Sequence, residues 1–156
     1  MRTPMIVVAF VLLGCGHATG YMAASPASYG FGYSETRLSE ASFQVVYAGN
    51  VSTKLQQAVD FAVLRGADLT LQNGYRSFSV VAESASWRAL GEGFSSSPTA
   101  VVTIVCYRET QTPTAVIGFD AAEVSRHIRA TYDLSAGAPD RLDASSSLPF
   151  GVDWKM

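Results

Sequence analysis

The sequence contains only two cysteines and two histidines among 156 residues, the side chains most readily used as a thiol nucleophile or as a base near neutral pH. A serine or cysteine nucleophile needs a base beside it, usually a histidine, and a third group that orients the base. His17 lies close to the N-terminus, so a Ser-His-Asp site would have to use His127. No Gly-x-Ser-x-Gly turn precedes an expected helix. The sequence therefore gives no support to a serine hydrolase.

Two weaker constellations stay open. Cys106 lies inside an apolar run, which favours a buried core thiol over a catalytic nucleophile. Glu123 and His127 are four residues apart on an expected helix, a spacing that can bind a metal ion but also suits an exposed pair. Because no third or fourth ligand is evident, we expect no metal and no cofactor. An enzyme or small-ligand carrier that uses Cys106 or the Glu123/His127 pair is the alternative function.

The N-terminus has the layout of an export signal. An uninterrupted apolar run from Met5 to Leu13 follows a single positive side chain, Arg2. A helix of this run would be about 14 Å long, roughly half of a ~30 Å hydrocarbon core, so it cannot span a membrane. No later stretch approaches the length of a membrane-spanning helix. We expect residues 1–14 to be a removable signal peptide.

The four residues from Leu12 to Cys15 resemble the bacterial lipobox, in which a cysteine becomes the lipidated N-terminus of the mature protein. A thiol suits this role because its thiolate is far more reactive than a hydroxyl near neutral pH. Two or more acyl chains on Cys15 would hold the protein on a membrane permanently. Gly16, in place of an Asp, favours the outer membrane. The alternative is an incidental cysteine behind an ordinary signal, cleaved after Ala18 or Ala24.

Charge and composition narrow the class of protein. The chain is 48% apolar and 15% charged, with a formal net charge of −2. A disordered acidic tail and a polybasic nucleic-acid binder are both excluded, because neither combines so many apolar residues with so little net charge. We expect one folded domain and no nucleic-acid partner.

The sequence divides into three parts after the signal. Residues 15–35 are rich in Gly, Ala, Ser and Tyr and predict a lipidated cysteine with a flexible tether. Residues 36–134 predict a globular domain, and residues 135–156 a disordered tail. Within the tether, Tyr29, Phe31 and Tyr33 alternate with glycines. They would either dock the tether onto the domain or pair with a partner strand.

The expected elements follow from periodicity and turn residues. Strands are predicted at 43–48, 75–83 and 100–108, with a short edge strand at 115–119. One helix is predicted from a Thr53/Gln56 capping box to a stop at Asn73-Gly74, and a second after an Asp120 cap. Between the strands, residues 84–98 read as a long loop containing Trp87. Loops of this length are often functional.

This order, β-α-β-β-(β)-α, predicts an α+β fold: a two-layer domain with two helices on one face of a small three- or four-stranded sheet. The first two expected strands are joined through a helix, so they would be parallel if they are adjacent.

Several segments together resemble a family of small proteobacterial lipoproteins of uncharacterised function. The residues that carry the resemblance are Gly32 to Thr36 with Leu38, Tyr47 to Asn50, Asp60 to Ala62, Leu64-Arg65, Leu69 to Leu71, Gly74-Tyr75 with Phe78, Thr103 to Cys106, and Phe119 to Ala122. The resemblance covers about residues 30–132. It implies a location in the cell envelope and a small domain, and it supplies no catalytic residues.

We therefore expect a lipid-anchored, periplasm-facing and non-enzymatic envelope protein with a structural or protein-interaction role. Its partners would be the membrane, through an acylated Cys15, and another envelope protein. The expected interaction residues are Tyr29, Phe31 and Tyr33 of the tether and Trp87 of the long loop.

Overall fold

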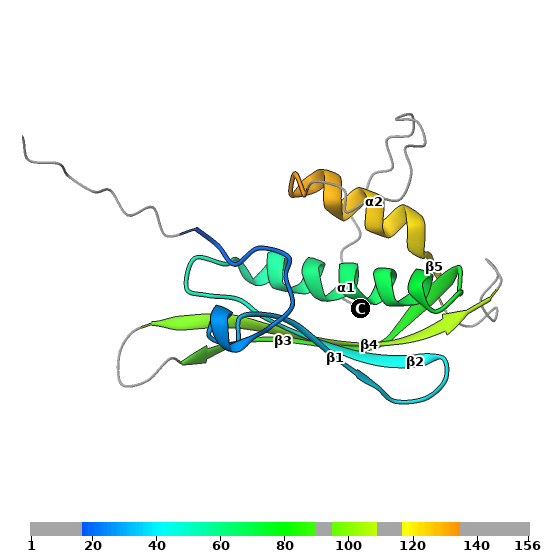
Figure 1. The fold of residues 1–156 in the computed structure, drawn as a ribbon, viewed down its shortest axis with the longest axis horizontal. Helices are drawn as coiled ribbons and strands as arrows, with labels where there is room; N and C mark the ends of the chain where they lie inside the picture. The colour runs from blue at the N-terminus through cyan, green and yellow to red at the C-terminus, as the bar shows by residue number, and fades with distance from the viewer. Residues whose placement is uncertain (1–16, 90–94, 109–116, 135–156) are drawn as a thin grey trace, which may run out of the picture.

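A computed structural model describes residues 17–89, 95–108 and 117–134 (Figure 1). The expected signal peptide, Cys15 and the C-terminal tail lie outside the described residues. The elements are, in chain order, a short 3-10 helix η1 (Pro26–Ser28), β1 (Gly32–Arg37), β2 (Ser42–Ala48), α1 (Leu55–Gln72), β3 (Ser77–Ala89), β4 (Ser96–Tyr107), β5 (Phe119–Asp120) and α2 (Ala121–Thr131).

The strands form one sheet in the order β1-β2-β4-β3-β5, and every neighbouring pair is antiparallel. The expected parallel contact between the strands on either side of α1 does not occur. β2 and β3 do run in the same direction, but β4 lies between them. The crossover through α1 therefore leaves a gap one strand wide, which β4 fills.

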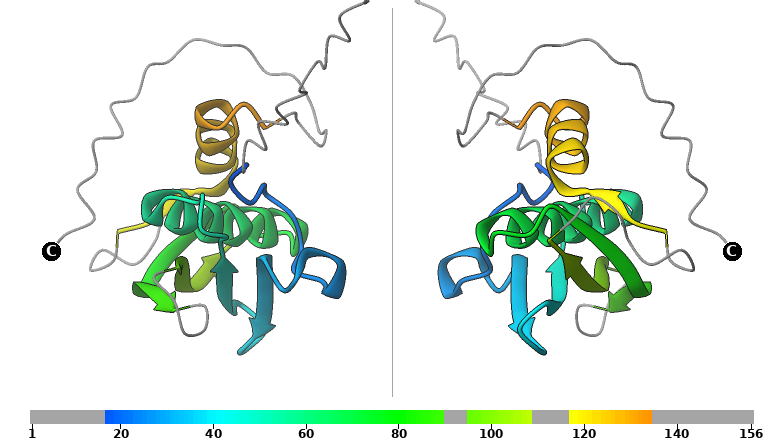
Figure 2. Two further views of the ribbon diagram at one scale, coloured as in Figure 1. Left: turned by 90° about the vertical axis from the view of Figure 1, so that its left-hand side faces the viewer. Right: turned by 90° about the vertical axis from the view of Figure 1, so that its right-hand side faces the viewer.

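The fold is α+β with two helices on one face of the sheet, as predicted. α1 lies directly on the sheet, whereas α2 stacks on the outer side of α1 (Figure 2). The sheet has five strands instead of three or four, because it includes β1, most of which lies in the segment that the sequence predicted to be tether.

The core lies between α1 and the two central strands. Every second residue of β2 and β4 is buried, including Val45, Tyr47, Val102 and Ile104, as expected for strands with one covered face. α1 approaches β4 closely at Gly66, where an added Cβ would lie 3.3 Å from two carbon atoms of Ile104. The helix can approach the strand this closely because Gly66 has no side chain.

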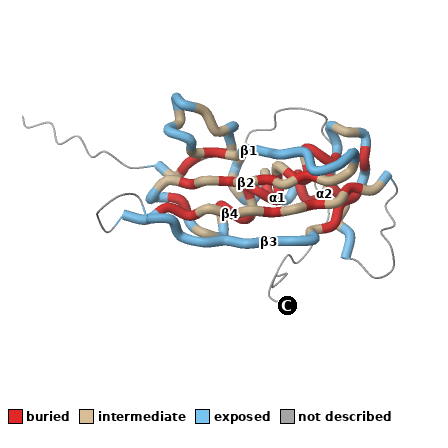
Figure 3. Tube along the Cα trace, turned by 90° about the horizontal axis from the view of Figure 1, so that it is seen from below, coloured by how far each residue is buried: buried red, intermediate tan, exposed pale blue. Residues whose placement is uncertain are grey.

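The predicted loop at residues 84–98 is wrong for residues 84–89 and 96–98, whereas residues 90–94 lie outside the described residues. Residues 77–89 and 96–107 are instead the long strands β3 and β4, paired from Ser77↔Tyr107 to Ala89↔Ser96. Periodicity does not reveal the second half of β3 because both of its faces are exposed, so Ser, Ala and Glu occupy it without an apolar alternation (Figure 3).

The predicted tether is also wrong for residues 17–35. We call residues 17–31 the N-terminal segment; it runs along the domain, and β1 follows it. Thr19 is 7% exposed, and Tyr33 packs against the core. Tyr33 also exchanges backbone hydrogen bonds with Met22 and Ala24. The segment is therefore a part of the folded domain.

The helix ends are mostly as the sequence predicts. Asp120 caps α2 by accepting a hydrogen bond from the Glu123 N–H at 2.9 Å, and Asn73-Gly74 ends α1, with Gly74 at φ +76°. The expected capping box at the start of α1 is absent. The residue before α1 is Lys54, and the Thr53 hydroxyl is used elsewhere.

Candidate functional site

The N-terminal segment is held at the start of α1 by buried hydrogen bonds. The Thr19 N–H donates to Thr53 Oγ1 at 3.1 Å, and the Tyr47 hydroxyl donates to the Thr19 carbonyl at 2.8 Å. Asn50 adds a contact from its side-chain amide to the His17 carbonyl at 2.8 Å. The chain is therefore fixed to the domain from its first described residue.

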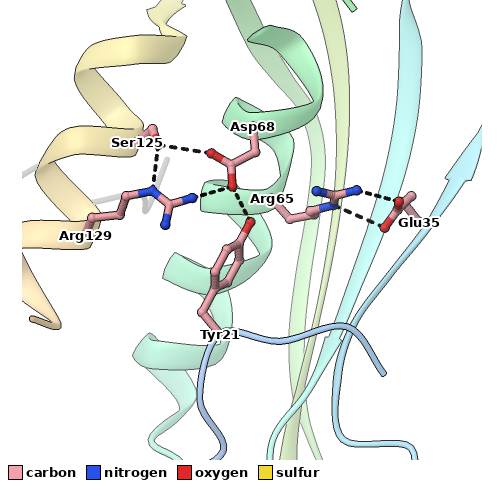
Figure 4. A network of polar contacts seen from close by, with 6 residues as sticks. All are labelled: Tyr21, Glu35, Arg65, Asp68, Ser125 and Arg129. Atoms are coloured by element: carbon pink, nitrogen blue, oxygen red, sulfur yellow. Dashed lines mark hydrogen bonds and ion pairs between the residues drawn. The ribbon is translucent and has the colours of Figure 1, made fainter. Parts of the chain in front are cut away.

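Asp68 on α1 is the centre of a second set of contacts (Figure 4). Its carboxylate accepts from the Tyr21 hydroxyl at 2.6 Å, from the Ser125 hydroxyl at 3.0 Å and from Arg129 Nη2 at 2.7 Å. The Asp68 side chain is only 13% exposed. We call these four residues the Asp68 cluster; it joins the N-terminal segment and α2 to α1.

The chemistry of the Asp68 cluster favours attachment over catalysis. Both carboxylate oxygens already accept hydrogen bonds, so Asp68 is poorly placed to take a proton from a substrate. Burial, followed by the hydrogen bond to Asp68, raises the pKa of Tyr21 far above its usual value, so its hydroxyl stays protonated. A protonated Tyr21 is a donor to Asp68 and no nucleophile.

A second ion pair fixes β1 to α1. Arg65 donates to both carboxylate oxygens of Glu35, at 2.6 Å from Nη2 and 3.2 Å from Nε (Figure 4). The same guanidinium lies 4.7 Å from the centre of the Tyr33 ring. A bidentate pair over an aromatic face suits Arg better than Lys.

The strand β3 carries the longest run of exposed residues among the described strands. β5 covers the outer edge of β3 only at Ser77 and Phe78, and residues 81–89 are all exposed (Figure 3). A register shift between Val80 and Ala82 marks a bulge where the exposed part begins. Val81 and Trp87 are 55% and 53% exposed.

The backbone of this edge is available for hydrogen bonding. Trp87 lies opposite Pro98, whose carbonyl points the other way and accepts from Gly49 at 2.9 Å. Trp87 therefore directs its own N–H and C=O outward, and alternation along the strand places those of Ala85 and Glu83 on the same side. Unpaired groups of this kind are a template for another strand.

A series of neighbouring residues, connected by strand pairing and hydrogen bonds, crosses one end of the domain. Trp87 pairs with Pro98, Pro98 bonds to Gly49, and the next residue, Asn50, bonds to His17. We call this surface the His17 end: residues 17–20, 49–54, 87–89 and 95–98. Val51, Lys54 and Arg88 are exposed on it.

The residues of the alternative function are not brought together as a site. Cys106 is 4% exposed, and its sulfur lies 3.3 Å from the Thr70 hydroxyl. Burial raises the pKa of the thiol, and this effect outweighs the opposing effect of the hydrogen bond between the thiol and Thr70. Glu123 and His127 lie on α2, and the described residues contain no group of three or more acidic, His or Cys side chains that could hold a metal ion.

The predicted aromatic residues have different environments. Tyr29 is 89% exposed, Phe31 is partly buried, and Tyr33 lies in β1 against Tyr21, with ring centres 4.9 Å apart. Of the two readings for these residues, Tyr33 fits docking onto the domain. Trp87 lies on a strand edge and at the His17 end, not in a loop.

Sequence reasoning missed the Asp68 cluster. The other three members lie 47, 57 and 61 residues from Asp68 along the chain, so no local spacing connects them to it. Only Ser125 and Arg129 have a visible spacing, one helical turn on α2, and such pairs are common on exposed helices.

No helix among the described residues is long and apolar enough to cross a bilayer. Comparison of the chain with known proteins finds no matching family model, no similar curated protein and no similar solved structure.

Proposed function

We propose that this chain is a lipid-anchored, non-enzymatic protein of the bacterial cell envelope, whose domain binds another envelope protein. The lipid would be carried by Cys15, and Gly16 favours the outer membrane. The observation that carries the proposal is the fixed position of the N-terminal segment next to the expected anchor.

The distance between anchor and domain is short. Cys15 precedes His17 by two residues and the buried Thr19 by four, so its Cα lies within about 14 Å of the Thr19 Cα. A long flexible tether would let the domain move away from the membrane and change its orientation. A linker of four residues between Cys15 and Thr19 would instead hold the domain beside the lipid headgroups. A fixed position at the membrane suits a protein whose role is to bind a partner in the same envelope.

The partner surface would be the open edge of β3. The outward N–H and C=O groups at Glu83, Ala85 and Trp87 can pair with an extended segment of another protein, which is a common mode of peptide recognition. The long exposed length of β3 supports this mode, because soluble proteins usually cover or shorten such edges.

Mass spectrometry of the purified native protein tests the anchor. We expect a mature N-terminus at Cys15 that carries two or more acyl chains, and a Cys15→Ser variant that is uncleaved or released from membranes. A retained Met1, or a trimmed N-terminus with an unmodified Cys15 sulfur, would contradict the proposal.

Site-specific crosslinking in cells tests the β3 edge. A photo-crosslinking residue at Val81 should capture one envelope protein reproducibly, whereas the same residue at Leu38, exposed in the turn between β1 and β2, should not. An Ala85→Pro substitution removes one outward N–H while sparing the bonds to β4. It should reduce capture at Val81; unchanged capture would rule out strand pairing at this edge.

A further inference from the structure

We propose that the His17 end of the domain rests against an anionic lipid bilayer, with Trp87 at headgroup depth and with Lys54 and Arg88 on the headgroups. This inference rests on the lipid anchor proposed above. It adds the orientation of the domain and names the residues that touch the membrane.

The position of the N-terminal segment sets which end faces the lipid. The chain leaves the described domain at His17, whose carbonyl is bonded to Asn50. The two residues from His17 back to Cys15 span at most about 7 Å between Cα atoms. An acylated Cys15 would therefore keep the His17 end close to the membrane surface.

The apolar side chains of this end are suited to the interface. Val51 is 57% exposed and follows Asn50, which is bonded to His17. Trp87 is 53% exposed and lies opposite Pro98 near the end of β3. Trp is enriched at membrane interfaces because its ring is apolar and its indole N–H can bond to headgroups or water. In Figure 1 the chain leaves at the same end of the molecule as the far end of the β3–β4 hairpin.

The charged side chains that the structure describes at this end are of one sign. The residues that define the His17 end contain two charged side chains, Lys54 and Arg88, and both are basic. The described residues form no ion pair with either of them. The chain as a whole carries a net charge of −2, whereas the described residues of this end carry two positive charges. Anionic lipid headgroups attract such a positively charged surface.

The open edge of β3 stays accessible in this orientation. β3 runs from Ser77, far from the His17 end, to Ala89 at it, so the strand would point toward the bilayer. Its exposed edge at Val81 would face the aqueous phase, where an envelope protein can pair with it.

Tryptophan fluorescence of the lipid-modified full-length protein tests the orientation. Trp154→Phe leaves Trp87 as the only tryptophan. The protein is reconstituted in phosphatidylethanolamine–phosphatidylglycerol vesicles with or without brominated acyl chains, which quench a nearby indole. We expect Trp87 emission to shift to shorter wavelength and to lose most of its intensity with the brominated lipid.

The matched control places the tryptophan at the opposite end of the sheet. In a Trp87→Phe/Trp154→Phe background, Leu38→Trp probes the turn between β1 and β2, where Leu38 is 54% exposed. Its emission should be unaffected by bromination. Equal quenching of the two probes, or no quenching of Trp87 in protein that floats with the vesicles, would overturn the orientation. An unquenched Trp87 would indicate that the His17 end contacts a protein partner or a second copy of the chain instead of the bilayer.

Charge reversal tests the role of the basic residues. Lys54→Glu/Arg88→Glu in the Trp154→Phe protein should reduce Trp87 quenching without releasing the protein from the vesicles; unchanged quenching would contradict the contact with anionic headgroups. The two proposals fail in different ways. An unmodified Cys15, or protein that does not float with vesicles, defeats the proposed function, whereas lipid-modified and floating protein with an unquenched Trp87 defeats only the orientation.

Discussion

The Tyr21 hydroxyl donates to the Asp68 carboxylate at 2.6 Å, which joins the N-terminal segment to the middle of α1. Arg129 of α2 donates to the same Asp68 oxygen and lies 5.3 Å from the centre of the Tyr21 ring. One carboxylate therefore attaches both the N-terminal segment and α2 to α1.

Removing the Tyr21 hydroxyl should loosen the N-terminal segment. Tyr21→Phe keeps the ring but loses a hydrogen bond to a charged acceptor, and we expect the free energy of unfolding to fall by about 1–2 kcal/mol. Urea denaturation measures the change. The matched control is Tyr29→Phe, at an 89% exposed ring, which should stay within about 0.5 kcal/mol of the parent. Equal losses in both variants would contradict a special role for Tyr21.

Removing Asp68 should cost more, because Arg129 would then keep a partly buried charge without its carboxylate. The two side chains are 13% and 22% exposed, and we expect Asp68→Ala to lower the free energy of unfolding by about 2–3 kcal/mol, below the range for fully buried pairs. Glu40→Ala is the control. The Glu40–Arg108 pair is 3.8 Å long with both side chains largely exposed, so thermal denaturation should show little change.

Gly66 and Ile104 should show energetic coupling. Gly66→Ala gains about 1 kcal/mol of helix propensity, but its Cβ would meet Ile104 at 3.3 Å, so we expect the net change to be small. Ile104→Val alone should cost about 1 kcal/mol and should cost less in the Gly66→Ala background, because it removes one of the two crowded carbon atoms. A double-mutant cycle measures this difference, and strict additivity would show that the contact is relaxed.

Glu83 should make stability depend on pH. Partial desolvation of the largely exposed Glu83 carboxyl, with a further contribution from the charge of Asp60, raises its pKa above the usual 4.5. A carboxyl whose pKa is raised by folding stabilises the fold when protonated and loses this contribution as the pH rises through the folded pKa. Glu83→Gln should therefore be slightly more stable than the parent at pH 7, with the difference closing below pH 4.5. Thermal melts at both pH values measure it; a constant difference would contradict the shift.

The Cys106 thiol should react slowly in the native protein. It is 4% exposed, and burial raises its pKa, so both access and the thiolate fraction are low. We expect iodoacetamide to label Cys106 readily in urea and hardly at all under native conditions at pH 8. Rapid native labelling would revive Cys106 as the nucleophile of the alternative function.

The predictable parts of the fold are those with a strong local signal. β2 and β4 alternate because one face is buried, Asp120 caps α2, and Gly74 ends α1 in a conformation that favours glycine. These signals depend on neighbours along the chain, so the sequence reveals them.

The parts that could not be predicted depend on distant partners. β1 looks like tether because Ser34 to Arg37 are all exposed, and only its pairing with β2 makes it a strand. The second half of β3 has no buried face to impose a pattern. The Asp68 cluster needs three segments to meet, and no spacing in the sequence shows that they do.

The position of β4 has a consequence for how the chain folds. β4 follows β2 and β3 in the sequence but lies between them in the sheet. Until residues 96–107 have left the ribosome, the edges of β2 and β3 that pair with β4 have no partner strand. The apolar face of α1 then also lacks the central strand against which it packs. Folding must wait for this late strand, and pairings so distant along the chain form slowly. The chain therefore lacks its complete core until most of the domain has been synthesised.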